Sequence, residues 1–277
     1  MQSRPTRNDP NRSLAVLMAA VLAGLACTEN SRPSEDLGPF VSRSQDTGPA
    51  RLDYPRVEGF TVEIAGPYIV LAGLTRLMTP SEPDLGEPLP HVRITVRDMT
   101  QAVLAETESD DSGAFILAVP IRPEGTDGYV ELTKDGYPTV RQFDRPFDEP
   151  WTNMRLRMLD ETLYAIPRQL LSQQDSSGYV QGSVYDRTTE VPLSGVRVVA
   201  SAGTVAYLSD GVPLPKTDLT ETQSQGVFFV ANCPPGPVTL RLLRGDEEVS
   251  TRTVLTWPGG VLTQVGVPVR DARSAHQ

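Results

Sequence analysis

A nine-residue pattern that occurs twice constrains this chain more than any other feature of its sequence. The first copy is Pro-Leu-Pro-His-Val-Arg-Ile-Thr-Val at 88–96, and the second is Pro-Leu-Ser-Gly-Val-Arg-Val-Val-Ala at 192–200. Each copy is followed by a Gly-x-Phe hairpin signal, which begins at Gly113 in the first and at Gly226 in the second. Because self-similarity at a long period determines architecture before local patterns do, the sequence predicts a tandem duplication of two small all-β units.

Apolar and polar residues alternate in short segments along both copies. Val92, Ile94 and Val96, for example, are separated by arginine and threonine, which is the pattern of half-buried strands. The strands expected in the first copy are 68–73, 92–97, 102–107, 113–117, 129–133, 139–143 and 153–158. Those expected in the second are 179–185, 196–200, 227–231, 238–243, 248–255 and 261–269. This number of strands in about 100 residues is typical of an antiparallel sandwich, so we predict an all-β fold of two tandem antiparallel β-sandwich domains.

The repeat also sets the expected domain boundaries. We predict the first sandwich over 58–159 and the second over 178–270, each with its own core, followed by a tail over 271–277. The intervening segment 160–177 has Leu163, Ile166, Leu170 and Leu171 at helical spacing with a proline among them, which predicts a linker with at most one short helix.

The motifs of the repeat resemble those of a known family. The second copy has Gly-Ser-Val-Tyr-Asp at 182–186, then Pro-Leu-Ser-Gly-Val at 192–196 and Gly-Val-Phe at 226–228, and the first copy adds Gly136-Tyr137. This order is similar to that of the carboxypeptidase regulatory-like domains, which have a transthyretin-like (prealbumin-like) β-sandwich fold. The first copy departs from the pattern with His91 at the position of Gly195. The resemblance covers about 57–270 and implies an accessory module, since fold alone does not specify an activity.

The N-terminal segment has the layout of a secretory signal peptide over 1–26. Three arginines precede an apolar run from Leu14 to Ala26, whose 13 residues are fewer than the roughly 20 that a membrane-spanning helix needs. The ending Gly-Leu-Ala-Cys at 24–27 resembles the bacterial lipobox, with Gly24 where leucine is usual, and implies lipidation at Cys27. Ordinary secretion is the alternative. Thr28 after the cysteine resembles a signal for sorting to the outer membrane, on its periplasmic or outer face.

Residues 27–57 are expected to form a flexible tether between the lipid and the first sandwich. They contain four prolines among polar and charged residues and no apolar periodicity, so they cannot bury enough apolar surface to offset the entropy of ordering.

The formal charge of −10 makes nucleic acid an improbable partner, because binding to phosphate backbones requires clustered cations. The partners that we expect are the membrane, through the lipid, and another envelope protein or a surface polysaccharide.

Residues suited to catalysis are few. The chain has two histidines, His91 in a turn and His276 near the C-terminus, so no zinc peptidase site can be assembled, and a Ser-His-Asp arrangement would have to use His91. We therefore expect no enzymatic activity, no catalytic residues and no cofactor.

Four acidic residues near the first Gly-x-Phe hairpin raise the question of a metal site. Glu106, Glu108, Asp110 and Asp111 could hold calcium through carboxylate oxygens, but the second copy has only Glu221 in the same region. We interpret the cluster as a solvated turn and predict no metal.

Both tryptophans stand beside a proline just before the last strand of their copy. Trp151 and Trp257 are therefore expected to plug the ends of the sandwiches. Aromatic rings also stack on sugars, so a carbohydrate-binding module that uses Trp151 or Trp257 is the alternative function.

The remaining candidates concern covalent cross-links. Cys233 is interpreted as a small buried apolar residue, with a disulfide to Cys27 as a minor alternative. A cross-linked adhesin module would join an early lysine to a late asparagine. Lys134 and Lys216, with Asn153 and Asn232, do not occupy those positions. The sequence thus favours a non-catalytic envelope protein that acts as a binding, spacer or scaffold module.

Overall fold

The computed structural model describes residues 67–79, 86–210 and 214–269. The predicted signal peptide, Cys27, the tether, the first residues of the predicted first sandwich, His276 and the tail lie outside the described residues. No helix in the described part of the chain is long and apolar enough to cross a membrane.

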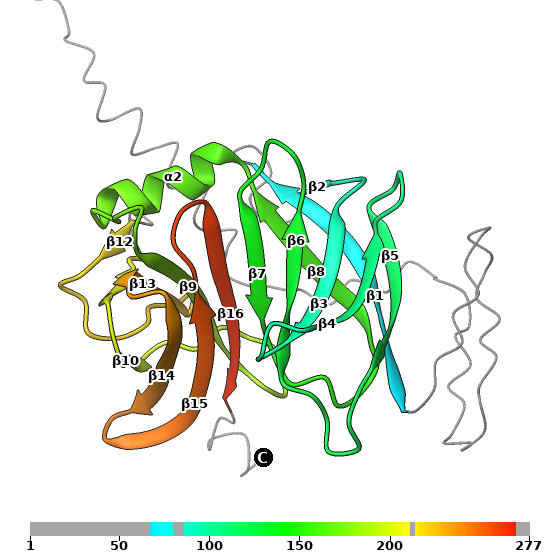
Figure 1. Cartoon of the computed structure of the whole chain (residues 1–277). Helices are drawn as coiled ribbons and strands as arrows, with labels where there is room; N and C mark the ends of the chain where they lie inside the picture. Colours follow the sequence, from blue (N-terminus) through cyan, green and yellow to red (C-terminus); the bar gives the residue numbers. More distant parts are fainter. Residues whose placement is uncertain (1–66, 80–85, 211–213, 270–277) are drawn as a thin grey trace, which may run out of the picture.

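The described residues are all-β apart from one helix, and the predicted class of two tandem antiparallel β-sandwiches is confirmed (Figure 1). The first half of the chain contains β1 (Tyr68–Met78), β2 (Glu87–Pro88), β3 (Arg93–Asp98), β4 (Val103–Glu108), β5 (Ala114–Pro120), β6 (Gly128–Thr133), β7 (Thr139–Phe143) and β8 (Trp151–Leu159). The second half contains β9 (Gly178–Asp186), β10 (Arg197–Ala200), β11 (Thr204–Leu208), β12 (Pro215–Lys216), β13 (Val227–Cys233), β14 (Gly236–Arg244), β15 (Glu247–Thr256) and β16 (Val261–Val269). Below, "the first half" means 67–159 and "the second half" means 178–269.

Each half consists of two sheets with related strand orders. In the first half, β8 and β5 flank β1, and β7, β6, β3 and β4 form the facing sheet. In the second half, β16 and β13 flank β9, and β10, β14 and β15 form the facing sheet. The strand after β3 stays beside it as β4, whereas the strand after β10 crosses to pair with β13 as β11. Strand β11, which lies in the longer insertion of the second copy, was not predicted from the alternation of apolar and polar residues.

The two halves are joined edge to edge into one sheet. Strand β7 of the first half pairs in parallel with β16 of the second, from Thr139 opposite Val261 to Phe143 opposite Val265. The result is a nine-stranded sheet in the order β12-β11-β13-β9-β16-β7-β6-β3-β4, in which β16 and β7 lie side by side (Figure 1).

The continuous sheet affects the hydrophobic cores, which were expected to be separate. One buried cluster contains most of the first half's apolar residues together with Tyr179, Phe229 and Leu262 of the second half. The other contains the second half's remaining apolar residues together with Tyr129 and Phe143 of the first half. Each core therefore includes side chains from both halves, while the boundaries at 58–159, 160–177 and 178–270 stay a prediction.

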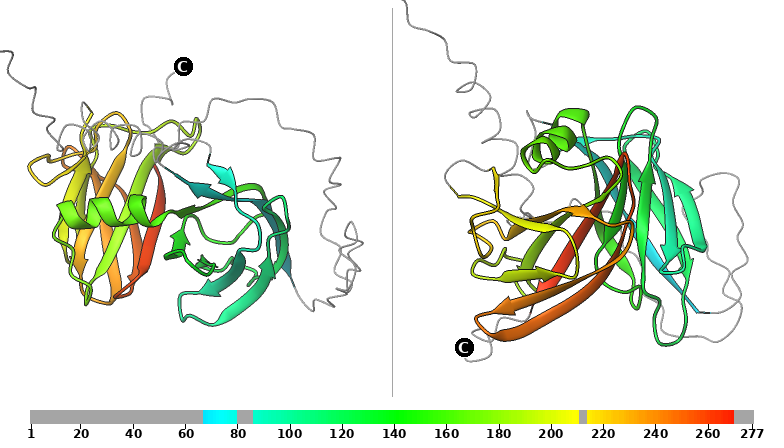
Figure 2. Two further views of the ribbon diagram at one scale, coloured as in Figure 1. Left: turned by 90° about the horizontal axis from the view of Figure 1, so that it is seen from above. Right: turned by 60° about the vertical axis from the view of Figure 1, so that its left-hand side comes forward.

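The single described helix, α2 (Glu161–Leu170), lies within the predicted linker and runs along the second sandwich (Figure 2). Asp160 is its N-cap, and its carboxylate accepts a hydrogen bond from the Leu163 amide at 2.7 Å. The buried face consists of Leu163, Tyr164 and Pro167, whereas Leu170 is exposed. Of the expected helical stripe, Leu163 is buried and Leu171 packs on the core, whereas Tyr164 and Pro167 are buried in place of Leu170.

The repeated sequence pattern forms the same hydrogen-bond latch in both halves. The amide of Val92 donates to Ser109 Oγ (3.0 Å), and that hydroxyl donates to the carbonyl of Leu89 (3.2 Å). In the second half, Val196 donates to Thr222 Oγ1 (3.1 Å), which donates to the carbonyl of Leu193 (2.8 Å). The hydroxyl therefore connects the strand entrance to the segment before the Gly-x-Phe strand.

Glycine is required next to each latch for two reasons. Gly113 and Gly226 have φ angles of +79° and +65°, a region that side chains disfavour. A Cβ atom would also lie 2.7 Å from the carbonyl oxygen of Thr75 at Gly113, and 2.4 Å from that of Val184 at Gly226. Phe115 and Phe228, two residues later, are buried.

We expect Ser109→Ala and Thr222→Ala each to lower the free energy of unfolding by about 1–3 kcal/mol, because each leaves a buried strand amide without its hydrogen-bond partner. Thr222→Ala also removes the donor to the Leu193 carbonyl, whereas the Leu89 carbonyl still accepts from Thr75 Oγ1. Urea denaturation followed by circular dichroism measures the change. Thr152→Ala, at an exposed strand position, is the control. Variants of Ser109 and Thr222 that are as stable as the control would contradict the latch.

Candidate functional site

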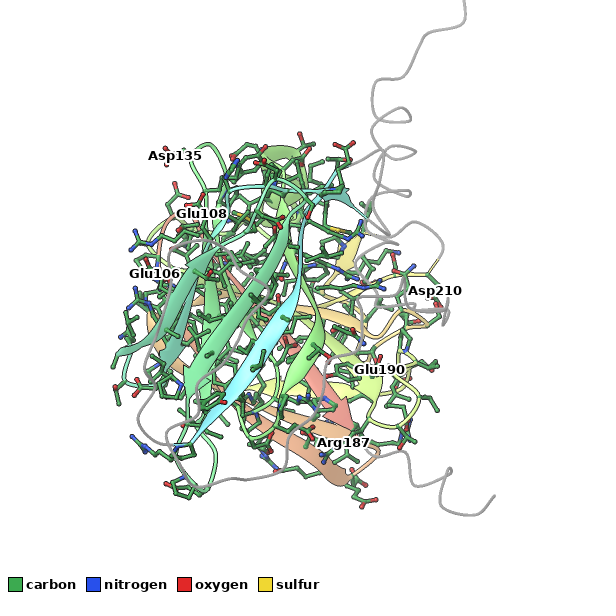
Figure 3. The ribbon with its side chains drawn as sticks, turned by 90° about the vertical axis from the view of Figure 1, so that its right-hand side faces the viewer. Glu106, Glu108, Asp135, Arg187, Glu190 and Asp210 are labelled. Carbon is green, nitrogen blue, oxygen red and sulfur yellow. The ribbon has the colours of Figure 1, made fainter. Side chains whose placement is uncertain are left out.

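Acidic side chains near the first Gly-x-Phe hairpin flank His91, and one of them, Glu108, is labelled beside Glu106 in Figure 3. The histidine has a φ of +54° at the position where the second half has Gly195. Its Nδ1 lies 3.1 Å from Glu108 Oε1, and its Nε2 lies 3.0 Å from Asp111 Oδ1. The two carboxylates thus flank opposite sides of the ring, so the three groups do not converge on one ion. Neither ring nitrogen faces a serine hydroxyl, as a catalytic triad would need.

The other two acids of the predicted cluster have separate partners. Asp110 accepts hydrogen bonds from the amides of Ser112 and Ala114, and its bond from the Ser112 hydroxyl is the main cause that lowers its pKa. Glu106 forms an ion pair with Arg93 at 2.8 Å. Within the described part of the chain, no group of three or more His, Cys, Asp or Glu residues is placed to hold a metal. Asp110 thus stabilises the turn, whereas Glu106 pairs across strands β3 and β4.

Trp257 contacts the first half instead of projecting into solvent. Its ring lies 5.4 Å from the ring of Tyr129 and 6.4 Å from that of Phe143, measured between centroids. The guanidinium carbon of Arg141 lies 3.7 Å from the Trp257 centroid, a close cation–π contact. The indole N–H donates to Gln101 Oε1 at 3.3 Å. Trp257 therefore fills a site made by β6, β7 and the turn after β3.

A buried acid, Glu131, positions one of the side chains that contact Trp257. Glu131 accepts hydrogen bonds from Arg97 Nε (3.0 Å) and Arg141 Nε (2.5 Å), and its side chain is 8% exposed. A carboxylate between two arginines is compensated in charge, so its burial is tolerated. Sequence reasoning did not identify Tyr129, Glu131, Arg141 or Phe143 as a site, because residues of separate strands meet only through the sheet.

Further polar contacts lie around the same join between the halves. Arg252 Nη2 of β15 lies 2.8 Å from Asp127 Oδ1 of the first half. Asp144, at the end of β7, accepts a hydrogen bond from Gln142 at 2.6 Å and lies against Gly266 of β16, where a Cβ atom would be 2.4 Å from its Oδ1. Burial raises the pKa of Asp144, and the bond from Gln142 opposes that shift.

Trp151 has a different environment from Trp257. It is half-buried at the start of β8, where it packs on the core of the first half, and Arg145 lies 4.8 Å from its ring centroid. The two tryptophans thus contact different hydrophobic clusters and do not form one platform. Their predicted role in binding a ligand stays a prediction.

The groups considered for covalent cross-links lie apart. Lys134 Nζ donates to the carbonyl of Pro90 at 2.9 Å, and Lys216 lies in β12 at the other end of the long sheet. The side-chain Nδ2 of Asn232 donates to the carbonyl of Ser172, and its Oδ1 accepts from the backbone amide of Gln174. Asn153 is exposed on β8.

Cys233 is fully buried in the core of the second half and forms no disulfide. Burial raises the pKa of its thiol to about 11, so almost none of it is thiolate at neutral pH.

We expect Cys233 to react with a thiol reagent only when the protein unfolds, because the thiol is both inaccessible and protonated. The measurement is titration with DTNB at pH 8, on the chain from residue 27 with Cys27→Ser, in buffer and in 6 M guanidinium as a fully denaturing reference. Rapid stoichiometric reaction in buffer would show that Cys233 is accessible.

Comparisons with known proteins give no family for this chain. No protein-family model matches it, and no curated protein matches it. Among solved structures, the Bacillus anthracis TIE protein shares 11% identity, with 73% of this chain and 34% of that chain covered and a TM-score of 0.23. This chain thus spans about a third of the length of that protein.

For two pilins, the region matched by this chain includes nearly the whole pilin. The shaft pilin SpaA of Lactobacillus rhamnosus GG shares 11% identity, covering 74% of this chain and 99% of the pilin, with a TM-score of 0.24. GBS52, the minor pilin of Streptococcus agalactiae, shares 14% identity, covering 74% of this chain and 96% of the pilin, with a TM-score of 0.25.

Proposed function

We propose that this chain is a non-catalytic lipoprotein of the cell envelope whose two joined β-sandwiches act as a spacer or scaffold for another envelope protein. The observation that carries the proposal is the nine-stranded sheet that runs through both halves. A sheet continuous across two sandwiches holds attached surfaces at a fixed separation, which is the property that a spacer requires.

The residues of the repeat support a structural role. Ser109 and Thr222 serve the latch, and Gly113 and Gly226 serve the turns beside it. His91 is held between two carboxylates, and Glu131 between two arginines. His91 and Glu131 thus have ionic partners within the fold.

The cell-envelope address rests on the N-terminal sequence. The arginine-flanked apolar run that ends at Cys27 supports export and lipidation, and Thr28 supports sorting to the outer membrane. The resemblance to carboxypeptidase regulatory-like domains supports an accessory module without a reaction of its own.

Palmitate labelling in a bacterial host tests the anchor. We expect the wild type and Cys233→Ala to take up label and Cys27→Ala to take up none, because Cys27 would carry the lipid and Cys233 is buried in the core. Equal labelling of the wild type and Cys27→Ala would contradict lipidation at this position.

A glycan array separates the scaffold from the alternative of a carbohydrate-binding module. With the chain from residue 27 carrying Cys27→Ser, we expect no sugar binding that depends on a tryptophan, since Arg141 lies over the ring of Trp257 and Arg145 over that of Trp151. Binding that is lost in Trp151→Ala or Trp257→Ala would favour the carbohydrate-binding module. Hydrolysis of peptides or esters that is lost in His91→Ala would contradict both.

A further inference from the structure

The last tryptophan of each copy has an equivalent place in its own half, which allows the two surroundings to be compared. Trp151 begins β8 and Trp257 precedes β16, and these two strands pair in parallel with β1 and β9, which occupy the same place in the two halves. The strands that receive Trp257 are β6 and β7, and their counterparts in the second half are β14 and β15.

The register of the sheets gives the equivalent residues. Ile94 lies opposite Leu132 in the first half, as Val198 lies opposite Leu242 in the second. In the next strand pair, Glu131 lies opposite Arg141, and Arg241 lies opposite Thr251. Tyr129, Arg141 and Phe143 therefore correspond to Thr239, Thr251 and Thr253.

The two halves differ at these three positions. In the first half, two aromatic rings and a guanidinium surround Trp257. In the second half, the corresponding surface has three threonines, and the hydroxyls of Thr239 and Thr253 lie 3.1 Å apart. Because threonine offers neither a ring face nor a cation, this surface lacks the contacts that hold an indole in the first half.

The segment that follows Trp257 is also held from outside its own sandwich. The amide of Thr139 donates to the carbonyl of Gly260 at 3.1 Å, and the hydroxyl of Tyr164 donates to that of Gly259 at 3.1 Å. The amide of Gly259 in turn donates to the carbonyl of Asp175 at 2.8 Å. The first half, α2 and the segment after it therefore all contact the one turn that carries Trp257.

We infer that Trp257 and its receiving site, defined as Tyr129, Arg141 and Phe143, form a lock that fixes the two sandwiches in one orientation. The lock supplements the β7–β16 pairing, which alone would leave two sandwiches joined along a single pair of edge strands. The second half has threonines at the corresponding positions, so it offers no receiving site for a tryptophan of a second chain. The same contact therefore does not add a further sandwich to the molecule. The lock deepens the spacer part of the proposed function.

Distances between spin labels test the lock. The labels are placed on cysteines at two exposed sites, Val103→Cys in the first half and Val199→Cys in the second, in the chain from residue 27 with Cys27→Ser. Cys233 is buried and is left in place. We expect a narrow distance distribution in this parent protein and a distribution at least about twofold broader in Trp257→Thr, because ring stacking and the cation–π contact would both be lost.

Two further variants keep the test decisive. Trp151→Thr removes the equivalent tryptophan away from the join and should leave the distribution narrow. Arg141→Thr introduces the residue of the second half into the receiving site and should broaden the distribution. It tests the lock independently if Trp257→Thr does not fold. Combined with Trp257→Thr, it should add less broadening than it causes alone, as expected for residues in contact.

Three results would overturn the lock. The first is a broad distance distribution in the parent protein, and the second is a narrow one in both Trp257→Thr and Arg141→Thr. The third is a concentration-dependent dimer of the parent protein that Trp151→Thr abolishes, because the second half would then accept a tryptophan from a second chain. These outcomes do not depend on the lipid anchor or on the partner. Failure of the lock can therefore be distinguished from failure of the proposed envelope function.

Discussion

The parallel pairing of β7 with β16 is the contact on which the arrangement of the whole molecule depends. It joins an edge strand of the first sandwich to the last strand of the second, which is also an edge, through five residue pairs, from Thr139 and Val261 to Phe143 and Val265. Exposed strand edges attract further strands, so pairing these two edges with each other also removes two sites of unwanted association. Both faces of the resulting sheet bury side chains from the two halves.

The duplication explains why the halves fold alike and differ where they meet. The latch of Ser109 and that of Thr222 use the same atoms in the same order, and the glycine beside each has no room for a side chain. On the outward faces of β6 and β14, by contrast, Tyr129 and Thr239 occupy equivalent positions with different partners. The residues on the outward face of β6 thus bind the other half, whereas those on the outward face of β14 do not.

The sequence predicted most local structure because that information is local. The alternation of Val92, Ile94 and Val96 indicated a half-buried strand, and 139–143 and 261–269 were predicted with the bounds that the structure has. Alternation does not reveal which strands pair across a distance of more than 100 residues, so the join of β7 to β16 was not predicted. One available signal was the uninterrupted apolar run at 227–231, which is typical of a strand buried on both faces.

The candidate site was less predictable than the fold for the same reason. Trp257 was identified as a plug or a sugar platform from its position beside a proline, but its neighbours Tyr129 and Arg141 come from strands of the other half. The acids near His91 were interpreted as a solvated turn, and Asp110 and its hydrogen-bond donors are adjacent in the sequence. Contacts within a hairpin follow from sequence, whereas contacts between halves need the three-dimensional arrangement.

Native-state hydrogen exchange at the join tests the central claim most directly, namely that the two halves share one sheet. If β7 and β16 are paired, the amides of 139–143 and 261–265 should exchange as slowly as those of the central strands β9 and β13, and all should be released in the same opening event. The contrary result is that the β7 amides exchange at the rate of frayed edge strands, at least about tenfold faster than the β9 amides. This result would show that the sandwiches are separate and would contradict this account.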